Sequence, residues 1–424
     1  MSQMFGTIMS RSMLSAASLA LVALTAVCSQ DPSGPQEITS LPRDLTASEA
    51  LLVQADNSFG LKLFREIQDG DSGENVFIAP LSVSMALGMA YNGADGATKD
   101  AMQEVLELQG LDLLQVNESY RDLIELLRGL DQAVEFRIAN SIWYDEAYEF
   151  QQDFLSVNRE YFDAEVAGLD FADPGSASTI NDWVAEGTNG RIEEIVDSPM
   201  SPELVMFLIN AIYFKGDWAN PFDEELTREG TFFLADGSEK PVEMMSYAKP
   251  DTVLAYLDQN EGVQVLDMKY GGKAYSMTIV LPQQPGDIGP LVAGLDSERW
   301  QRWLDGLEEM QAQVSMPKFT LEYELELNDA LEALGMGVAF DPFSADFTKI
   351  YSGPQRAYLS KVKHKTFLDV NEEGTEAAAA TSVEIGVTSM PPMIVVDRPF
   401  LLAIREKFSG TILFLGVMVD PLAE

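Results

Sequence analysis

Apolar residues recur at helical spacing near the start of the main body of the chain. Thr46 and Glu49 stand three positions apart, in the pattern of a capping box that begins a helix. The apolar positions that follow are Leu52, Ala55, Phe59, Leu63 and Ile67. Because this spacing gives a helix one apolar face, we predict a first helix that ends near Gly70.

Shorter apolar segments further along the chain predict both strands and helices. Residues 75–106 indicate a short strand, a proline and then an apolar helix rich in Ala, Gly and Met. Another helix is expected over Ile180–Ile195, stopped at Gly190. The expected strands are Val134–Tyr144, Leu204–Phe214, Lys361–Val370, Phe400–Ile404 and Thr411–Val419. Among them, Leu204–Phe214 is apolar on both faces, which is typical of a strand in the middle of a covered sheet.

A stretch near the C-terminus alternates as a half-buried strand does. Every second residue is small or apolar, giving the set Thr375, Ala377, Ala379, Thr381, Val383, Ile385 and Val387. The intervening residues include both carboxylates of the stretch, Glu376 and Glu384. A shift of one position would bury these charges, so the pattern predicts a strand of defined register.

The same stretch is also punctuated like a loop. It opens with Glu372-Glu373-Gly374 and ends in Pro391-Pro392, where a central strand cannot continue. Its four consecutive alanines, residues 377–380, are poor strand formers but are small enough to enter a narrow space between strands. We therefore predict a segment that is a loop first and a strand later.

Composition favours one large acidic domain. The chain has 424 residues, of which 46% are hydrophobic, and we find no linker or internal repeat that would divide it. Its 68 acidic and 27 basic residues give a net charge of −41, which argues against nucleic acid and heparin-like polyanions as partners. Two interpretations of the charge stay open: an ordinary acidic protein, or an extracellular protein from a saline habitat.

The N-terminus predicts export. Arg11 precedes an apolar run over residues 13–27, which is too short to span a membrane but suits a secretory signal. Cys28, the only cysteine, ends the run where a bacterial lipoprotein carries its lipid, so lipidation and simple cleavage both stay open. We expect a signal over 1–28, a flexible tether over 29–45 and one domain over 46–424. The protein is then secreted or held at the cell envelope, with membrane attachment through Cys28 in the lipidated case.

Catalytic and metal-binding motifs are missing from the sequence. His364 is the only histidine, and it shares an apolar strand face with Val362 and Thr366, where a histidine is usually part of the core. With Cys28 in the export segment, no Ser-His or Cys-His pair is credible. Nor do we find an HExxH, CxxC or nucleotide-binding glycine pattern. We expect no enzyme activity, no metal and no cofactor.

The stretch EEGTEAAAAT, followed by a variable segment and Asp397-Arg398-Pro399-Phe400, resembles the reactive-centre loop of the serpins. Residues 75–106 are similar to the N-terminal signature of that family, and the resemblance extends from about Ala47 to Pro421. It implies an α+β fold with three β-sheets, about eight or nine helices and an exposed loop over about 372–392.

The resemblance also implies roles for individual residues. The hinge of the loop would comprise Gly374, Thr375, Glu376, Ala377, Ala378, Ala379, Ala380 and Thr381. Loop length makes Thr388–Ser389 the reactive bond, 14 residues after Gly374 and 10 before Pro399. Ser82, Asn210 and His364 would form a polar cluster beneath the opening sheet, and Trp218 would lie where the loop enters. Ala79 stands where the family usually has serine, so this cluster lacks one hydroxyl.

Two functions follow from the resemblance. In the first, the chain is a monomeric suicide inhibitor of a serine protease, trapped as an acyl-enzyme when the cleaved loop inserts into the central sheet. A small residue at Thr388 favours an elastase-like or subtilisin-like target. In the second, the chain is a non-inhibitory member: a chaperone, a carrier or a protease substrate. The inward hinge residues carry no charge and no proline, which favours the inhibitor.

Overall fold

The computed structural model describes residues 35–70, 73–201, 204–354, 356–375 and 391–423. Residues 35–424 form one compact unit, apart from residues 1–34. The expected reactive bond Thr388–Ser389, the hinge residues 376–381 and Cys28 lie outside the described residues, and what the sequence predicts for them stays a prediction. No helix of the described ranges is long and apolar enough to cross a membrane.

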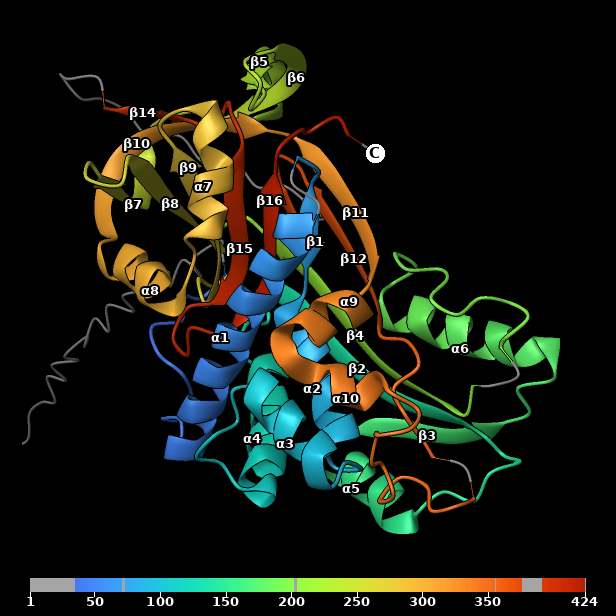
Figure 1. The fold of residues 1–424 in the computed structure, drawn as a ribbon. Coiled ribbons are helices and arrows are strands. Elements are labelled where there is room, and N and C mark those ends of the chain that lie inside the picture. Colours follow the sequence, from blue (N-terminus) through green and yellow to red (C-terminus); the bar gives the residue numbers. More distant parts are fainter. Residues whose placement is uncertain (1–34, 71–72, 202–203, 355, 376–390, 424) are drawn as a thin grey trace, which may run out of the picture. The chain divides into compact units, whose positions relative to one another are not determined.

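Helices and strands are mixed along the described chain, with three successive helices over residues 80–128 and five successive strands over residues 228–282, as Figure 1 shows. The helices are α1 (Ala47–Gly70), α2 (Pro80–Tyr91), α3 (Gly96–Val105), α4 (Leu113–Arg128), α5 (Gln152–Phe162), α6 (Pro174–Gly187), α7 (Ile288–Ala293), α8 (Ser297–Asp305), α9 (Asn328–Leu331) and α10 (Gly337–Phe340). Between α9 and α10, over Glu332–Met336, the chain kinks at Gly335, where φ is 117°. Counted as one kinked helix, α9 and α10 bring the α-helices of the described residues to nine.

The strands form three sheets in the described residues. They are β1 (Val76–Ile78), β2 (Val134–Asp145), β3 (Ala164–Leu169), β4 (Met206–Asp217), β5 (Arg228–Phe233), β6 (Glu239–Ser246), β7 (Asp251–Asp258), β8 (Val263–Tyr270), β9 (Tyr275–Pro282), β10 (Glu308–Pro317), β11 (Phe319–Glu326), β12 (Lys363–Val370), β13 (Gly374–Thr375), β14 (Met393–Val395), β15 (Phe400–Glu406) and β16 (Ile412–Met418). The largest sheet runs β1-β16-β15-β9-β8-β7-β10-β6-β5, with β14 beside β10. The other two are β13-β4-β2-β3 and β11-β12, which confirms the predicted α+β class with three sheets.

Local signals set the helix boundaries. The capping box of α1 is present: Glu49 accepts from the Thr46 backbone N–H at 2.6 Å, and Thr46 Oγ1 accepts from the Glu49 N–H at 3.2 Å. The prediction for α6 was wrong at both ends, because this helix starts at Pro174 and stops at Gly187. Asp173 caps the helix by accepting a hydrogen bond from the Gly175 N–H. This capping residue lies before the first apolar residue of the predicted helix, so the apolar spacing did not reveal the true start.

Strand β4 is covered on both faces, as its apolar sequence predicted. Ile212 and Phe214 belong to the main core, while Ile209 belongs to a second cluster beneath α6. Its position in the sheet differs from the prediction, however. One edge pairs with β2 along eleven residues, but the other edge pairs only with the two residues of β13 in the described chain. A strand with the composition of a central strand therefore has one edge almost unpaired.

The end of the expected tether lies against the body. The Ile38 N–H donates to the Gly272 carbonyl at 2.7 Å, and Glu37 pairs with Lys273 at 2.9 Å. Ile38, Leu41 and Leu45 are half-buried and pack on the main core. Residues 35–45 are thus fastened to the domain, which leaves residues 29–34 as the part of the tether that the structure does not describe.

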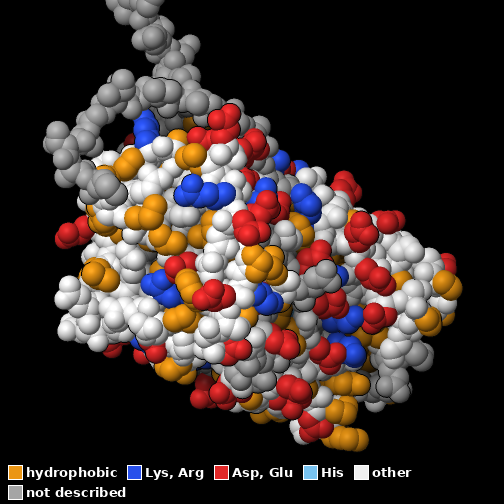
Figure 2. All heavy atoms as spheres, turned by 90° about the horizontal axis from the view of Figure 1, so that it is seen from above, with side chains coloured by type: hydrophobic (Ala, Val, Ile, Leu, Met, Phe, Trp, Pro, Cys, Tyr) orange, Lys and Arg blue, Asp and Glu red, His pale blue; other side chains and the backbone are white. Residues whose placement is uncertain are grey.

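Acidic residues are spread over the surface. On the face drawn in Figure 2, Asp and Glu side chains lie across the described surface with Lys and Arg side chains between them. Many of the basic side chains pair with a carboxylate, as in Lys361–Glu326 and Arg299–Glu261. On this face, basic side chains therefore lie among acidic ones.

Candidate functional site: the gap between β4 and β12

The candidate site is the gap between strands β4 and β12, which are edges of two separate sheets. Strand β12 pairs with β11 over its whole length, and β13 follows it after a tight turn. The Asn371 N–H donates to the Gly374 carbonyl at 3.0 Å, so the chain reverses here. Because β13 is antiparallel to both neighbours, β4 and β12 run parallel to each other. A third strand between them, antiparallel to both, would join the two sheets into one.

Trp218 lies where β13 meets β4. Its backbone N–H donates to the Glu373 carbonyl at 2.8 Å, and its indole Nε1–H donates to the Asn371 carbonyl at 3.0 Å. Its ring stacks on Tyr270, with the ring centroids 4.3 Å apart. The predicted tryptophan is therefore bound to the turn that starts the loop.

Gly374 needs to be glycine because the backbone of β4 lies so close. A Cβ at this position would stand 2.3 Å from the Gly216 carbonyl oxygen and 2.6 Å from the Asp217 Cα. Gly374 pairs with Asp217, and Thr375 pairs with Gly216. The two described hinge residues thus already occupy the first two positions of a strand in the gap.

Glu372 fastens this turn, and the sequence analysis did not find it. Its carboxylate is buried and accepts from Thr227 Oγ1 at 2.7 Å and from Lys318 Nζ at 3.0 Å. Burial alone would raise the pKa of Glu372, but these two hydrogen bonds, a backbone hydrogen bond and the charge of Lys318 together hold that pKa below its usual value. Since 54 residues separate Lys318 from Glu372, no sequence spacing signals the pair.

The predicted polar cluster lies halfway down the gap. Ser82 on α2 donates its hydroxyl to the Asn210 carbonyl at 3.2 Å, and Asn210 donates its amide to Asn140 Oδ1 at 2.6 Å. Ser82, Asn210 and His364 line one cavity of about 460 Å³. The Asn210 side-chain oxygen is buried and has no hydrogen-bond partner in the described part of the chain. It is an acceptor available to a group that enters the gap.

His364 receives its hydrogen bond from the residue that departs from the family pattern. The backbone N–H of Ala79 donates to His364 Nε2 at 3.0 Å, so the missing hydroxyl does not leave the imidazole unbonded. Burial lowers the pKa of His364 to about 4, and the ring is neutral at pH 7. A neutral imidazole with Nε2 occupied as an acceptor has its other ring nitrogen available as a donor.

Cavities follow the gap along its length. The space near Ile212 and Leu368 is small, about 20 Å³, and is lined in part by Phe214 and Phe367. Below it come the cavity at His364 and another of about 540 Å³ that reaches Tyr148 and Tyr351. Apolar residues make up about half of these walls, and the cavity at His364 is also lined by Asp197, Lys361 and Lys363.

Comparison with known proteins identifies similar chains along nearly the whole length. The family model "Serpin (serine protease inhibitor)" matches residues 54–421. Human Serpin B8 is 35% identical over 377 residues, which covers 87% of this chain and 99% of that protein. The leukocyte elastase inhibitor of Bos taurus is 34% identical, with 87% and 99% covered.

Solved structures agree with this similarity. The native state of the thermophilic serpin tengpin superposes with a TM-score of 0.79 at 30% identity, covering 91% of this chain and 97% of that one. Human thyroxine-binding globulin superposes with a TM-score of 0.80 at 28% identity, covering 89% and 100%. The similar chains therefore include inhibitors by name and also a binding protein by name.

Proposed function

The chain belongs to the serpin family, and we propose that it is an inhibitory member that traps a serine protease by inserting its cleaved loop between β4 and β12. Like other serpins it is not an enzyme, and its class of partner is a serine protease. The observation that carries the proposal is the unpaired edge of β4, which β13 has begun to fill.

Two registers support the insertion. On β4, Gly374 pairs with Asp217 and Thr375 with Gly216, so the partners' numbers sum to 591. On the β12 side, the Asn371 N–H donates to the Gly374 carbonyl, so the residue numbers of each antiparallel pair there sum to 745. Extended by arithmetic, 591 − 381 = 210 and 745 − 381 = 364, so an inserted strand in this register would have Thr381 between Asn210 and His364. The threonine hydroxyl suits the free Asn210 acceptor and the imidazole donor.

Both registers also assign the same residues to the inward face. Directly opposed residues of a ladder point to the same side. The small or apolar set that contains Ala377 and Ala379 would share the side of Phe214 and Ile212, which belong to the main core. Glu376 would share the other side with Lys215 (591 − 376 = 215). The chain thus keeps charge off the core side, and on the other side Glu376 would lie between Lys215 of β4 and Asp369 of β12 (745 − 376 = 369).

Thr375→Arg tests the proposal. Thr375 pairs with Gly216, and a Cβ at Gly216 would contact the rings of Tyr270 and Phe214 at 3.1 and 3.2 Å. An arginine on this side would put a charge against aromatic core, so insertion should stall and the protease should deacylate. We expect the covalent complex on denaturing gels to fall at least about tenfold, since burying an unpaired charge costs well over about 1.4 kcal/mol.

Glu376→Gln is the matched control. It changes the neighbouring residue on the opposite side without adding bulk, and we expect it to inhibit like the wild type. An undiminished yield of complex from Thr375→Arg, with normal folding by circular dichroism, would contradict insertion at this position.

The target we propose is an elastase-like or subtilisin-like protease. Thr388 is small and β-branched, which fits a shallow specificity pocket and lacks the charge that trypsin-like enzymes require. One similar chain is itself named an elastase inhibitor, which agrees with this class. Incubation with a panel of serine proteases, scored for complexes that survive denaturing gels, identifies the target.

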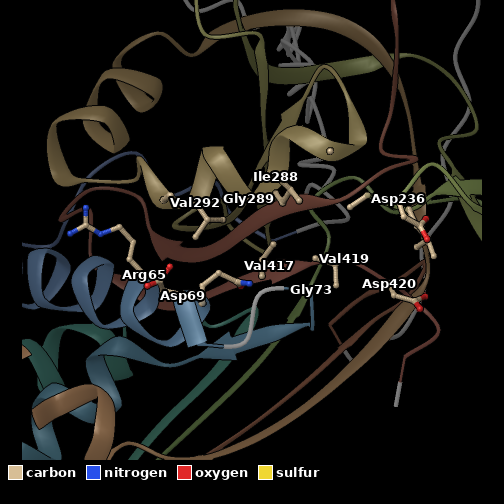
Figure 3. Close-up of a pocket in the computed structure, with 15 residues that line it drawn as sticks. Arg65, Asp69, Gly73, Asp236, Ile288, Gly289, Val292, Val417, Val419 and Asp420 are labelled. Atoms are coloured by element: carbon tan, nitrogen blue, oxygen red, sulfur yellow. The ribbon is translucent and has the colours of Figure 1, made fainter. Parts of the chain in front are cut away.

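A second candidate, a small-molecule carrier, is favoured by a separate cavity. Its volume is about 610 Å³, and Figure 3 shows that α1, α7 and β16 contribute its walls. Ile288, Val292 and Val417 are apolar, while Arg65 and Asp69 lie at one end and Asp236 and Asp420 at the other. An apolar cavity with charged ends suits an amphiphilic molecule, and one structure similar to this chain is named a thyroxine-binding globulin.

Thyroxine is a suitable first probe of this cavity. If the chain is a carrier, thyroxine should bind the wild type with a Kd in the micromolar range or below, by titration of tryptophan fluorescence. Val292→Trp should fill the cavity and weaken binding at least about tenfold, because a ligand cannot share the occupied volume. The absence of binding, or equal binding by Val292→Trp, would exclude thyroxine carriage at this site.

A further inference from the structure

A row of polar residues crosses one side of the sheet at strands β8, β9 and β15. Lys269 stands opposite Ser276, and Ser276 stands opposite Arg405, so these three side chains lie on the same side. The ladder continues one position past β15, where the Lys407 N–H donates to the Ala274 carbonyl at 2.9 Å. Because Lys407 is two residues beyond Arg405, it shares that side as well.

The arginine of this row is balanced by a buried carboxylate. Arg405 donates from Nη2 to Asp267 Oδ1 and from Nε to Thr278 Oγ1, both at 2.9 Å. Glu406, the next carboxylate along the chain, belongs to the opposite side of the sheet and accepts from the N–H groups of its own turn. Asp267 and Arg405 therefore neutralise each other, and the charges of the two lysines in the row are left over.

Positive charge gathers at the end of this row. Of the three lysines there, only Lys273 forms an ion pair in the described residues, with Glu37 at 2.9 Å. Burial lowers the pKa of Lys407, and repulsion by the charge of Lys269 lowers it further. Lys273, followed by Lys269 and Lys407, holds the pKa of Glu37 below its usual value. Three lysines and one glutamate give a local charge of 3 − 1 = +2, in a chain whose net charge is −41.

Ser276 adds a hydroxyl group without a partner to the same row. Its side chain is fully buried, and its Oγ has no hydrogen-bond partner in the described part of the chain. The ladder places it between Lys269 and Arg405. A buried hydroxyl group normally forms a hydrogen bond, and an oxyanion attracted by the lysines would provide the acceptor.

We propose that a phosphate group binds between Lys269 and Lys407 and accepts a hydrogen bond from Ser276. This inference does not rest on the proposed function. A phosphate group carries roughly 1.5 to 2 negative charges near pH 7, and it has enough oxygens to accept from two ammonium groups and a hydroxyl group at once. Both lysines are half-buried, so salt screens their attraction for an anion less than at an open surface.

The phosphate group is either free or part of a lipid headgroup. The segment that leads to the N-terminus passes this site, since Glu37 pairs with Lys273 and the Ile38 N–H donates to the Gly272 carbonyl. Nine residues separate Glu37 from Cys28 (37 − 28 = 9), which is a reach of up to about 30 Å. In the lipidated case, the headgroups of the membrane would lie within reach of the two lysines.

Titration calorimetry with inorganic phosphate at pH 7.5 tests the site. We expect one phosphate per chain, with a Kd of about 1 mM. Lys269→Gln and Lys407→Gln should each weaken binding at least about tenfold, because each removes a charge-assisted hydrogen bond. Ser276→Ala should weaken it about fivefold, through the loss of a neutral hydrogen bond. Glu37→Gln should tighten it about two- to fivefold, because the anion no longer meets a neighbouring carboxylate.

Lys99→Gln is the matched control. Lys99 is half-buried like Lys407, and its ammonium nitrogen lies 5.2 Å from the centroid of the Tyr91 ring, as that of Lys407 lies 5.1 Å from the Phe408 ring. The change removes the same charge from a different part of the molecule. We expect Lys99→Gln to bind phosphate with the wild-type affinity.

Sedimentation with vesicles of phosphatidylglycerol and phosphatidylcholine distinguishes the two sources of phosphate. The protein used carries Cys28→Ser, so that no attached lipid contributes to binding. Pelleting that is lost in Lys269→Gln and Lys407→Gln supports the site with a lipid headgroup as its ligand. Calorimetric binding that these changes weaken, without pelleting, supports the site with free phosphate as its ligand. No binding in either assay, or binding that both lysine variants retain in full, would overturn the proposal.

Discussion

We expect cleavage of the loop to raise the melting temperature of the protein by about 12 °C or more. Extending the register of β13 pairs residues 376–385 with Lys215 to Met206, which adds ten strand positions. At about 1 kcal/mol net for each new hydrogen bond, the gain is about 10 kcal/mol. A compact unit of 390 residues (424 − 34) has an unfolding entropy near 0.8 kcal/mol per kelvin, from about 2.1 cal/mol per kelvin and residue.

The cleaving enzyme matters for this measurement. A metalloprotease attacks with metal-bound water and forms no acyl-enzyme, so it can cut the loop without being trapped. Calorimetry before and after the cut should show the shift, whereas Thr375→Arg cut in the same way should gain little. Equal melting temperatures for the intact and cut wild type would contradict insertion and favour a non-inhibitory serpin.

The sequence predicts those features of this site that follow from the periodic spacing of apolar residues. The period of two in residues 375–387 predicts an inward and an outward set. Residues 376–387 lie outside the described residues, so this assignment stays a prediction, with which the registers extended from β4 and β12 agree. The double-sided apolar pattern of Leu204–Phe214 predicted a strand covered on both faces, and β4 is covered in this way. Periodicity succeeds here because it reports which side of a strand is buried.

Contacts between distant segments could not be predicted in this way. The Glu372–Lys318 pair and the Asp197–Lys363 pair join residues 54 and 166 positions apart, and no sequence spacing connects the two members of either pair. The start of α6 was missed for a different reason. Its first turn is Pro174-Gly175-Ser176, which carries no large apolar side chain, and the cap at Asp173 and the proline after it mark the start. Capping residues deserve the same weight as periodicity when a helix begins with small residues.

The composition of β4 explains why the sequence predicted a strand in the middle of a sheet. Its composition is that of a central strand, yet in the described residues one edge meets only Gly374 and Thr375. The amino-acid composition of a strand reflects the surroundings of its residues in each conformation that the protein adopts. An apolar strand with an open edge is an aggregation hazard unless other residues cover that edge. Here residues of the segment 188–200 line the cavities beside this edge of β4.

Thr388→Arg should redirect inhibition to trypsin-like proteases. The residue before the reactive bond enters the specificity pocket, and an arginine there provides the charge that a pocket aspartate selects. The bond Thr388–Ser389 keeps Thr388 on the outward set, whereas Val387–Thr388 would put an inward residue at the acyl position. Met390–Pro391 is disfavoured because the proline ring restricts the residue before it.

The change in protease specificity should be large, and the position of the cleaved bond can be measured. We expect the second-order rate constant toward trypsin to rise at least about 100-fold, since a paired charge in the pocket contributes several kcal/mol to binding. The rate toward the wild-type target should fall by a similar factor, because a shallow pocket excludes the long side chain. Mass spectrometry of the released C-terminal fragment should find Ser389 at its start in both proteins. A fragment from an inhibited complex that begins at Thr388 or Pro391 would move the reactive bond, and with it the length of the inserted strand.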